Sequence, residues 1–450
     1  MLIAGHLGHT DTLNLARCCH QFYNSLILQV YNSTQFEEHC LWAFSRLVHI
    51  LIQHPQRAVA VFNLSLGSWN RFCLRHHDKG VKFDRNIILP VLQTVCHSKE
   101  EQEDWETDLQ EGGAEDPWLA LLMPLLPHLD QLNMMFEYPS AHMHKMLERA
   151  VRNFNPFDAN QAFTSLREVS VTWWDTESGV NSSDVLPFFR FPAMRTFRGH
   201  MTVDAHPDGN REGMDDGLPS SDFSKITTID LRSSNSGRGF PDLLCACENL
   251  ESFSYLHADG GVGSDGFNPL AFYHSLYHHK NTLRKLKILF DIDKGYYPLG
   301  SSTEDVFVGS LAAFSDLKEI CLRASNVLDF DEEQSGLIRT PLIKVFPMSL
   351  ESLSLEDVDK KDLKVLISQL EEVVRNAKSY FPHLSKLAIE GNLHESEEFD
   401  FTAWLSQTLP RNTRRGPLVI KPEFVGMTQN LRTLCHDMDI NFCLWDRQCK

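Results

Sequence analysis

A six-residue phrase, Leu-x-x-Leu-x-Leu with some substitutions, recurs along most of this chain. Four clear copies begin at Leu283, Leu317, Leu350 and Leu384. Successive clear copies start 34, 33 and 34 residues apart. Looser copies begin at Leu129, Leu166, Met194, Ile226 and Leu250. Such a period is typical of stacked-repeat proteins, in which each unit buries its apolar face against its neighbours, so the sequence predicts a solenoid.

The phrase and the segments between its copies predict a strand followed by a helix. Side chains alternate along an extended segment, so the fourth and sixth positions, such as Leu353 and Leu355, should face one core together. Helical spacing of apolar residues appears at 363–377 and 308–314, and a helix start appears at Asn268. Parallel strands need a crossover connection. We therefore expect an α/β solenoid with one continuous parallel sheet in chain order.

Composition narrows the possible functions. The chain has 450 residues, of which 42% are hydrophobic, and a formal net charge of −18. That charge argues against a nucleic-acid partner and against an anionic membrane surface. No run approaches the ~20 apolar residues of a transmembrane helix, and no secretion signal is apparent. Eleven cysteines without a spacing framework indicate reduced thiols, so we expect a cytosolic or nuclear protein.

Three segments depart from the repeat. Residues 100–116 hold nine acidic residues and no basic one, which predicts a mobile, solvated insertion. Residues 203–222 are rich in glycine and proline, which predicts a long exposed loop. Near the end, a helix at 427–438 and a strand at 441–445 predict an atypical terminal unit, a cap over about 427–450.

The first 55 residues do not fit the repeat and indicate a separate helical module. Asp11 is placed to cap a first helix, a second helix passes through Leu26, and a third should run from Phe36 to a stop at Pro55. The expected domains are therefore a helical module at 1–55 and an irregular solenoid at 56–450.

The segment LGHTDTLNLARCCHQFYNSLILQVYNS, from Leu7 to Ser33, resembles the F-box of the F-box/leucine-rich-repeat-like proteins that are numerous in filamentous fungi. It supplies the family's pattern through Leu7, Asp11, Leu13, Leu15, Ala16, Cys19, His20, Phe22, Tyr23 and Tyr31. The resemblance is tight at the N-terminus and loose through the repeats. It implies a leucine-rich-repeat fold.

The resemblance also implies a function. Such a chain would be a non-catalytic substrate receptor of a cullin-RING (SCF-type) ubiquitin ligase. Its F-box would hold the adaptor subunit, and through it a cullin, by Leu7, Leu13, Leu15, Ala16, Cys19 and Phe22. Its repeats would hold a protein target.

One departure leaves alternatives open. The family's F-box normally opens with a Leu-Pro turn ahead of the first helix, and this chain begins at Met1 with LIAGHL instead. Either the true start lies upstream, or this copy binds the adaptor weakly or not at all. In the second case the chain would be an interaction scaffold without ligase coupling.

The open face of the sheet should carry the third, fifth and seventh positions of the phrase, which alternate away from the core. The candidate partner-binding residues on that face are Asp230, Arg232, Lys285, Lys287, Glu319, Arg323, Glu356 and Glu390. The period places Lys285 and Lys287 near Glu319 and Arg323, and Glu356 near Glu390. Charges of both signs suit a protein surface better than a polyanion.

Enzymatic and cofactor hypotheses are weaker. Gly261, Gly263 and Gly266 imitate a dinucleotide-binding motif, but the helix start follows the glycines and the expected acidic residue is missing. Residues 208–213 imitate a calcium loop without its final glutamate. Cys18, Cys19 and His20 are contiguous and cannot face one metal ion together. We therefore expect no enzyme, no cofactor and no metal site, with an α/β enzyme as the third alternative.

Overall fold

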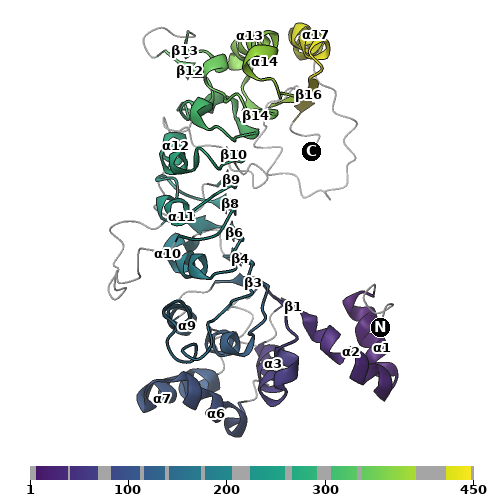
Figure 1. The fold of residues 1–450 in the computed structure, drawn as a ribbon, viewed down its shortest axis with the longest axis vertical. Helices are drawn as coiled ribbons and strands as arrows, with labels where there is room; N and C mark the ends of the chain where they lie inside the picture. The colour runs from purple at the N-terminus through teal and green to yellow at the C-terminus, as the bar shows by residue number, and fades with distance from the viewer. Residues whose placement is uncertain are drawn as a thin grey trace, which may run out of the picture. The chain divides into compact units, whose positions relative to one another are not determined.

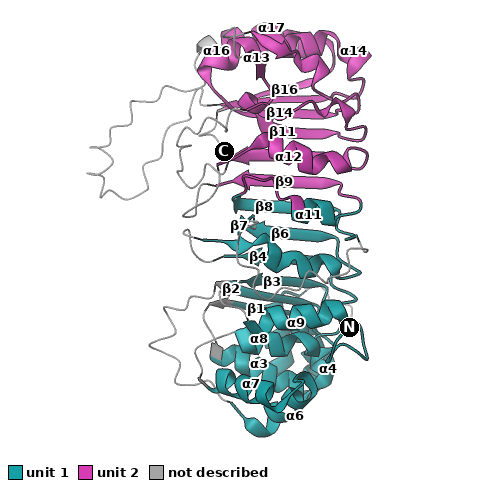
Figure 2. Cartoon of the chain, turned by 90° about the vertical axis from the view of Figure 1, so that its left-hand side faces the viewer, with its two compact units in different colours: residues 1–235, 242–248, 260–264 teal, residues 236–241, 249–259, 265–450 magenta. Residues whose placement is uncertain are grey.

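The computed structural model describes residues 7–38, 41–68, 83–111, 116–136, 141–173, 178–204, 223–258, 266–290, 306–331, 337–391 and 422–446. The chain divides into two compact units (Figure 2). Unit 1 comprises Met1–Asn235, Asp242–Glu248 and Gly260–Ser264. Unit 2 comprises Ser236–Pro241, Asn249–Asp259 and Asp265–Lys450.

The main sheet has twelve strands among the described residues, in the order β1-β2-β3-β4-β6-β8-β9-β10-β11-β14-β15-β16. Within unit 1 the strands from β1 to β8 pair in parallel, and so do those from β9 to β16 within unit 2. The predicted fold, an α/β solenoid with a parallel sheet in chain order, is confirmed.

Unit 1 combines six sheet strands with helices, of which α9 and α10 lie on one side of the strands in Figure 1. The strands are β1 Ser33–Glu38, β2 Asn63–Ser68, β3 Gln131–Met135, β4 Glu168–Thr172, β6 Thr196–His200 and β8 Thr228–Ser234. A small second sheet pairs β5 Val180–Asn181 with β7 Thr202–Val203.

The helices of unit 1 fall before, between and after these strands. They are α1 His9–Cys18, α2 His20–Asn32, α3 Leu41–Gln53, α4 Pro55–Ala58, α6 Arg85–Val95, α7 Lys99–Glu111, α8 Asp116–Leu122, α9 Ala141–Arg152 and α10 Ser182–Val185. The helix α11, Pro241–Ala246, lies almost entirely in unit 1. Two 3-10 helices are η2 Met123–Leu125 and η3 Leu186–Arg190.

Unit 2 repeats the same arrangement with several of its helices reduced to single turns. Its sheet strands are β9 Ser252–His257, β10 Lys285–Phe290, β11 Glu319–Arg323, β14 Ser352–Val358, β15 Lys386–Gly391 and β16 Asn441–Asp446. A hairpin pairs β12 Asp329–Phe330 with β13 Ile338–Thr340. The helices are α12 Pro269–Leu276, α13 Lys360–Arg375, α14 Ala377–Tyr380, α16 Pro422–Met427 and α17 Gln429–Asp437. The 3-10 helices are η4 Tyr277–His279, η6 Leu311–Ala313, η7 Ala324–Asn326 and η8 Leu342–Lys344.

The phase predicted for the strands is confirmed. Leu353 and Leu355 are fully buried, whereas Ser352 and Ser354 between them are half-buried. The register stacks equivalent positions of successive repeats, so that Ile320 pairs with Leu353 and Leu353 with Leu387. Each fourth-position side chain therefore lies directly against those of the neighbouring repeats, which makes the core continuous along the unit.

Hydroxyl side chains add hydrogen bonds between neighbouring repeats just before the strands begin. The Thr282 hydroxyl donates to the carbonyl oxygen of Leu250 at 2.9 Å, and the Ser349 hydroxyl donates to that of Leu317 at 2.8 Å. Both hydroxyls come from the residue just before the phrase and reach the first residue of the preceding copy. They satisfy carbonyl groups that the strand pairing leaves unpaired at this edge.

Of the three helices predicted between copies of the phrase, at 363–377, at 308–314 and from Asn268, two are confirmed. The helix α13 includes the predicted segment from Leu363 up to Arg375. The helix α12 starts where predicted, and the Asn268 side chain caps it by accepting a hydrogen bond from the N–H of Ala271. The helix predicted at 308–314 is wrong, because only the short η6 forms there. Gly309 has φ +105, a left-handed conformation that an α-helix does not accommodate.

The predicted start of the third helix, at Phe36, is wrong. Residues 33–38 form β1, which pairs in parallel with β2 and places Thr34 opposite Leu64. The first strand of the sheet therefore begins where a third helix was expected, and α3 follows it. The helix α1 starts after Gly8, with Asp11 in its first turn rather than at its cap.

The solvated insertion predicted at 100–116 is also wrong where the structure describes it. Residues 99–111 form α7, and Glu101, Trp105 and Leu109, spaced four residues apart, are all buried. This spacing places them on one face of the helix, while most of the acidic side chains occupy the other face.

Two other segments were predicted to depart from the repeat, the terminal unit at 427–450 and the loop at 203–222. Near the end of the chain, the predicted helix corresponds to α17 and the predicted strand to β16. The loop predicted at 203–222 lies outside the described residues except for 203–204. Residues 208–213, Gly261 and Gly263 also lie outside them.

Candidate protein-interaction surfaces

The N-terminal hairpin of α1 and α2 has a very small core. Ala16 and Leu26 are buried, and the partly buried Leu15 and Val30 pack against them. The Cys19 side chain accepts a hydrogen bond from the N–H of Phe22 at 3.5 Å and so caps the start of α2. Four apolar side chains do not form enough core to stabilise two helices alone.

Large apolar side chains remain outside this small core. Leu13 is 36% exposed, Phe22 43% and Leu28 44%. Of the predicted adaptor-binding residues, Leu15 and Ala16 therefore belong to the core, and Leu13 and Phe22 to the surface. Leu7 is half-buried and Cys19 is exposed. A hairpin that exposes more large apolar side chains than it buries presents a surface suited to a protein partner.

On the sheet face of unit 1, the two predicted residues neutralise each other. Asp230 and Arg232 both lie on β8, and the Arg232 guanidinium donates to the Asp230 carboxylate, with nitrogen-to-oxygen distances of 2.9 and 3.0 Å. Arg232 is exposed and Asp230 is half-buried. Both remain accessible to a partner.

On the sheet face of unit 2, the period correctly predicts one charged contact. The Lys285 Nζ lies 2.8 Å from a carboxylate oxygen of Glu319, its register partner on β11. Lys287 stands opposite Cys321, whose thiol donates to Glu356 at 3.3 Å. Burial, with the charge of Glu356, raises the pKa of Cys321 to about 12, so this cysteine is a poor nucleophile.

Two predicted surface residues are buried instead. Arg323 is 6% exposed and Glu390 is 5% exposed. The Arg323 guanidinium lies over the ring of Phe290, 4.2 Å from its centroid, and its Nε donates to the Asp357 carboxylate at 2.8 Å. The seventh position is therefore covered in these two repeats. The face open to a partner in unit 2 is narrower than predicted and consists mainly of Lys285, Lys287, Glu319 and Glu356.

The sequence interpretation missed a second row of ion pairs at the second position of the phrase. Arg284 lies 3.4 Å from Glu251, and Lys318 lies 2.8 Å from Glu351. Each pair joins consecutive repeats. The period alone could have identified these pairs, because opposite charges occupy equivalent positions 33 residues apart.

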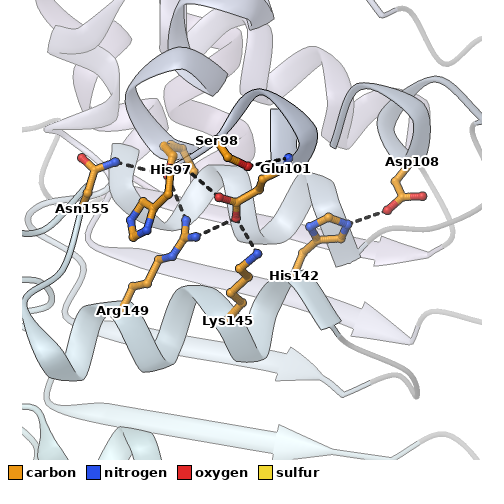
Figure 3. Close-up of polar contacts among 9 residues, drawn as sticks. His97, Ser98, Glu101, Asp108, His142, Lys145, Arg149 and Asn155 are labelled. Atoms are coloured by element: carbon orange, nitrogen blue, oxygen red, sulfur yellow. Dashed lines mark hydrogen bonds and ion pairs between the residues drawn. The ribbon is translucent and has the colours of Figure 1, made fainter. Parts of the chain in front are cut away.

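A buried ionic cluster between α7 and α9 was also missed (Figure 3). One carboxylate oxygen of Glu101 accepts from Arg149 at 2.6 Å and from Lys145 at 2.7 Å. The other oxygen accepts from the backbone N–H of His97 at 2.7 Å. Arg149 is 6% exposed and also donates to the carbonyl oxygen of Val95 at 2.9 Å. The cluster therefore fastens α7 and the preceding turn to α9.

Two further polar contacts hold α9, one with α8 and one with α7. Asp116 accepts from the N–H groups of His142 and Met143 at 2.8 and 3.0 Å, which caps the start of α9. The His142 Nε2 lies 2.6 Å from Asp108 on α7, and its ring packs edge-on against Trp105. Burial raises the pKa of Asp116, although these hydrogen bonds oppose the rise.

The electrostatics of the Glu101 cluster follow from its contacts. Burial alone would raise the pKa of Glu101, but the hydrogen bonds from Lys145 and His97 and the charge of Arg149 lower it to about 2. A carboxylate held by two cations cannot serve as a base at neutral pH. We interpret this cluster as structural.

Two features are absent from the described residues. These residues contain no group of three or more histidine, cysteine or acidic side chains arranged for a metal ion. Within those residues, no helix has the length and apolar character needed to cross a membrane.

Comparison with known proteins agrees with the repeat architecture. A family model for the leucine-rich repeat domain matches residues 43–395, from α3 to just beyond β15. The search of curated proteins returns no match. Leucine-rich repeat domains generally bind proteins and are typically non-catalytic. Since the match covers most of the sequence, the chain belongs to the leucine-rich repeat family.

Proposed function

We propose that this protein is a substrate receptor of a cullin-RING ubiquitin ligase. In this proposal the α1–α2 hairpin binds the adaptor subunit, and through it a cullin, while the repeat surface binds a protein target. The chain itself performs no reaction. Such a receptor works in the cytosol or nucleus, and the eight cysteines that are described as free thiols fit either compartment.

The observation that carries the proposal is the exposed apolar surface of the hairpin. Leu13, Phe22 and Leu28 expose large apolar side chains on two helices whose apolar core, among the described residues, consists of four side chains. Burying each of these side chains would contribute about 1 kcal/mol to association, since roughly two fifths of each remains to be covered. The F-box resemblance supplies the identity of the partner, and the leucine-rich repeats supply the target surface.

A second candidate function is an interaction scaffold without ligase coupling. The family match begins at residue 43, after the hairpin, so it supports protein binding by the repeats and does not extend to the adaptor. The two candidates share the repeat surface and differ only in what the hairpin binds.

Adaptor binding separates them. We expect the purified full chain to bind a purified fungal adaptor, and Phe22→Asp to weaken that binding at least 10-fold, because a carboxylate would be placed in an apolar contact. Asn24→Asp is the matched control, since it adds the same charge to an exposed position of the same helix. Both affinities can be measured by isothermal titration calorimetry, with circular dichroism to verify folding.

Two results would contradict the ligase proposal. The first is that neither the chain nor a version extended upstream by its genomic sequence binds the adaptor. The second is equal weakening by Phe22→Asp and Asn24→Asp, which would show that net charge and not the apolar surface controls association.

A further inference from the structure

An arginine on the first repeat (residues 41–68, from α3 to β2) contacts the hairpin through two tyrosines. Arg57 belongs to α4, and its guanidinium donates to the Tyr23 hydroxyl at 3.0 Å and to the Tyr31 hydroxyl at 3.4 Å. Its Cζ also lies 5.4 Å from the centroid of the Tyr31 ring. Tyr23 and Tyr31 are eight residues apart on α2, so their backbone positions lie about 12 Å apart along the helix axis. The single Arg57 guanidinium therefore contacts side chains from two separate turns of the helix.

The last turn of α2 is built into the sheet. The helix ends at Asn32 and β1 begins at Ser33, so no linker separates them. The N–H of Phe62, one residue before β2, donates to the carbonyl oxygen of Asn32 at 3.0 Å. The Thr34 hydroxyl on β1 donates to the carbonyl oxygen of Tyr31 at 3.2 Å.

These contacts do not by themselves prevent α2 from bending about its junction with β1. The continuous backbone fixes where α2 leaves the sheet, but a helix joined at a single end can still bend about that point. Tyr23 lies more than two turns from the junction, and the Arg57 contact there opposes such bending. A planar guanidinium bound to two hydroxyls loses little further freedom on forming these bonds, which suits it to this role.

We propose that Arg57 is a positioning residue, which holds the α1–α2 hairpin in one orientation on the first repeat. Its consequence for function rests on the proposed ligase role: a partner bound to the hairpin would be held at a fixed direction from the repeat surface, which limits the lysines that the ligase can reach. Arg57 would then affect where ubiquitin is transferred without contributing to adaptor affinity.

The orientation can be measured in the free full-length chain. Spin labels on non-canonical residues at Asn14 of α1 and Gln93 of α6, both exposed, report the distance between hairpin and repeat by double electron–electron resonance. We expect Arg57→Ala to broaden the distance distribution at least two-fold. The double variant Tyr23→Phe, Tyr31→Phe should broaden it as well, because it keeps both rings and removes only the hydroxyl groups.

Arg46→Ala is the matched control. Arg46 is an exposed arginine on the neighbouring α3, where it lies over Trp42 of its own helix. A distribution of wild-type width in both the Arg57→Ala and the double-tyrosine variants would overturn the proposal. Equal broadening by Arg46→Ala would overturn it too, since any loss of surface charge would then suffice.

A second measurement tests the functional consequence. In a reconstituted ligase, the lysines of the chain that acquire ubiquitin can be mapped by mass spectrometry. We expect a restricted set in the wild type and at least twice as many modified lysines in Arg57→Ala, with adaptor affinity changed less than two-fold. An unchanged set would overturn this consequence. If the adaptor does not bind the wild type, the ligase proposal fails, while the distance measurement still decides the role of Arg57.

Discussion

Glu101→Gln should destabilise the contact between α7 and α9 by about 3 kcal/mol. The substitution leaves Arg149 nearly fully buried without its counter-charge, and breaking a buried ion pair in this way costs about 3–5 kcal/mol. The pKa of Glu101, which the same contacts lower, gives a figure of similar size. Its fall from 4.5 to about 2 in the folded protein corresponds to about 3 kcal/mol, because each pH unit is worth about 1.4 kcal/mol.

Hydrogen exchange is the appropriate assay for this change. A repeat protein of 450 residues need not unfold in one step, so a single unfolding free energy is a poor measure. Exchange of the α7 and α9 amides reports the local opening directly. We expect these amides to exchange about 100-fold faster in Glu101→Gln, and the strands of unit 2 to be unchanged.

Glu103→Gln provides the matched comparison. Glu103 lies on the same helix, is 65% exposed and pairs with the exposed Lys99 at 3.6 Å. Exposed pairs of this kind contribute about 0–1 kcal/mol, so exchange should change less than five-fold. Replacing Glu101 and Arg149 together by Met should recover most of the loss, because no buried charge remains unpaired and water can solvate Lys145, whose side chain is 51% exposed. Equal effects of the two single glutamine variants would refute the reasoning.

The lowered pKa also fixes the direction of the pH dependence. A carboxylate whose folded pKa lies below its unfolded value contributes stability that is fully present above about pH 4.5. That contribution is lost as the pH falls toward about 2. An acid titration followed by near-UV circular dichroism should therefore show a transition in the wild type that moves to higher pH in Glu101→Gln. Coincident transitions would mean that the cluster does not stabilise the protein against acid.

The remaining predictions concern the sheet. Leu353→Asp should lower the melting temperature severely, because it buries an unpaired charge, whereas Ser354→Asp should be mild; the reverse order in thermal melts would put the strand phase wrong by one residue. Reversing Lys285 and Lys287 to Glu together should weaken capture of the endogenous target in proximity labelling at least three-fold without affecting the adaptor. Unchanged capture would mean that the target binds another surface.

The elements that the sequence predicts best are those that the repeat itself specifies. The buried positions of β14 and the contact between Lys285 and Glu319 both follow from the period, because stacked strands bring equivalent residues together. The same period would have predicted the pair of Lys318 and Glu351. Contacts between equivalent positions of neighbouring repeats are therefore accessible without a structure.

Two elements were missed because their local sequence gives the wrong signal. The strand β1, STQFEE, lacks the leucine phrase, and only its pairing with β2 makes it a strand. The acidic composition around α7 suggests a solvated segment, although Glu101, Trp105 and Leu109 mark a helical face. In the first case tertiary pairing overrides the local pattern. In the second, the charge of one face concealed the spacing of the other.

The burial of Arg323 has a different cause, which lies in an irregularity of the next strand. The register between β14 and β15 shifts between Leu355 and Val358, and Asp357 has φ +56, in the left-handed region. This irregularity allows the Asp357 carboxylate to meet Arg323 at 2.8 Å, although a regular strand would bring Arg323 against Glu356, its register partner. No local sequence pattern announces such a bulge. A regular repeat thus predicts which residues share a face, whereas single departures from regularity decide which of them a partner can reach.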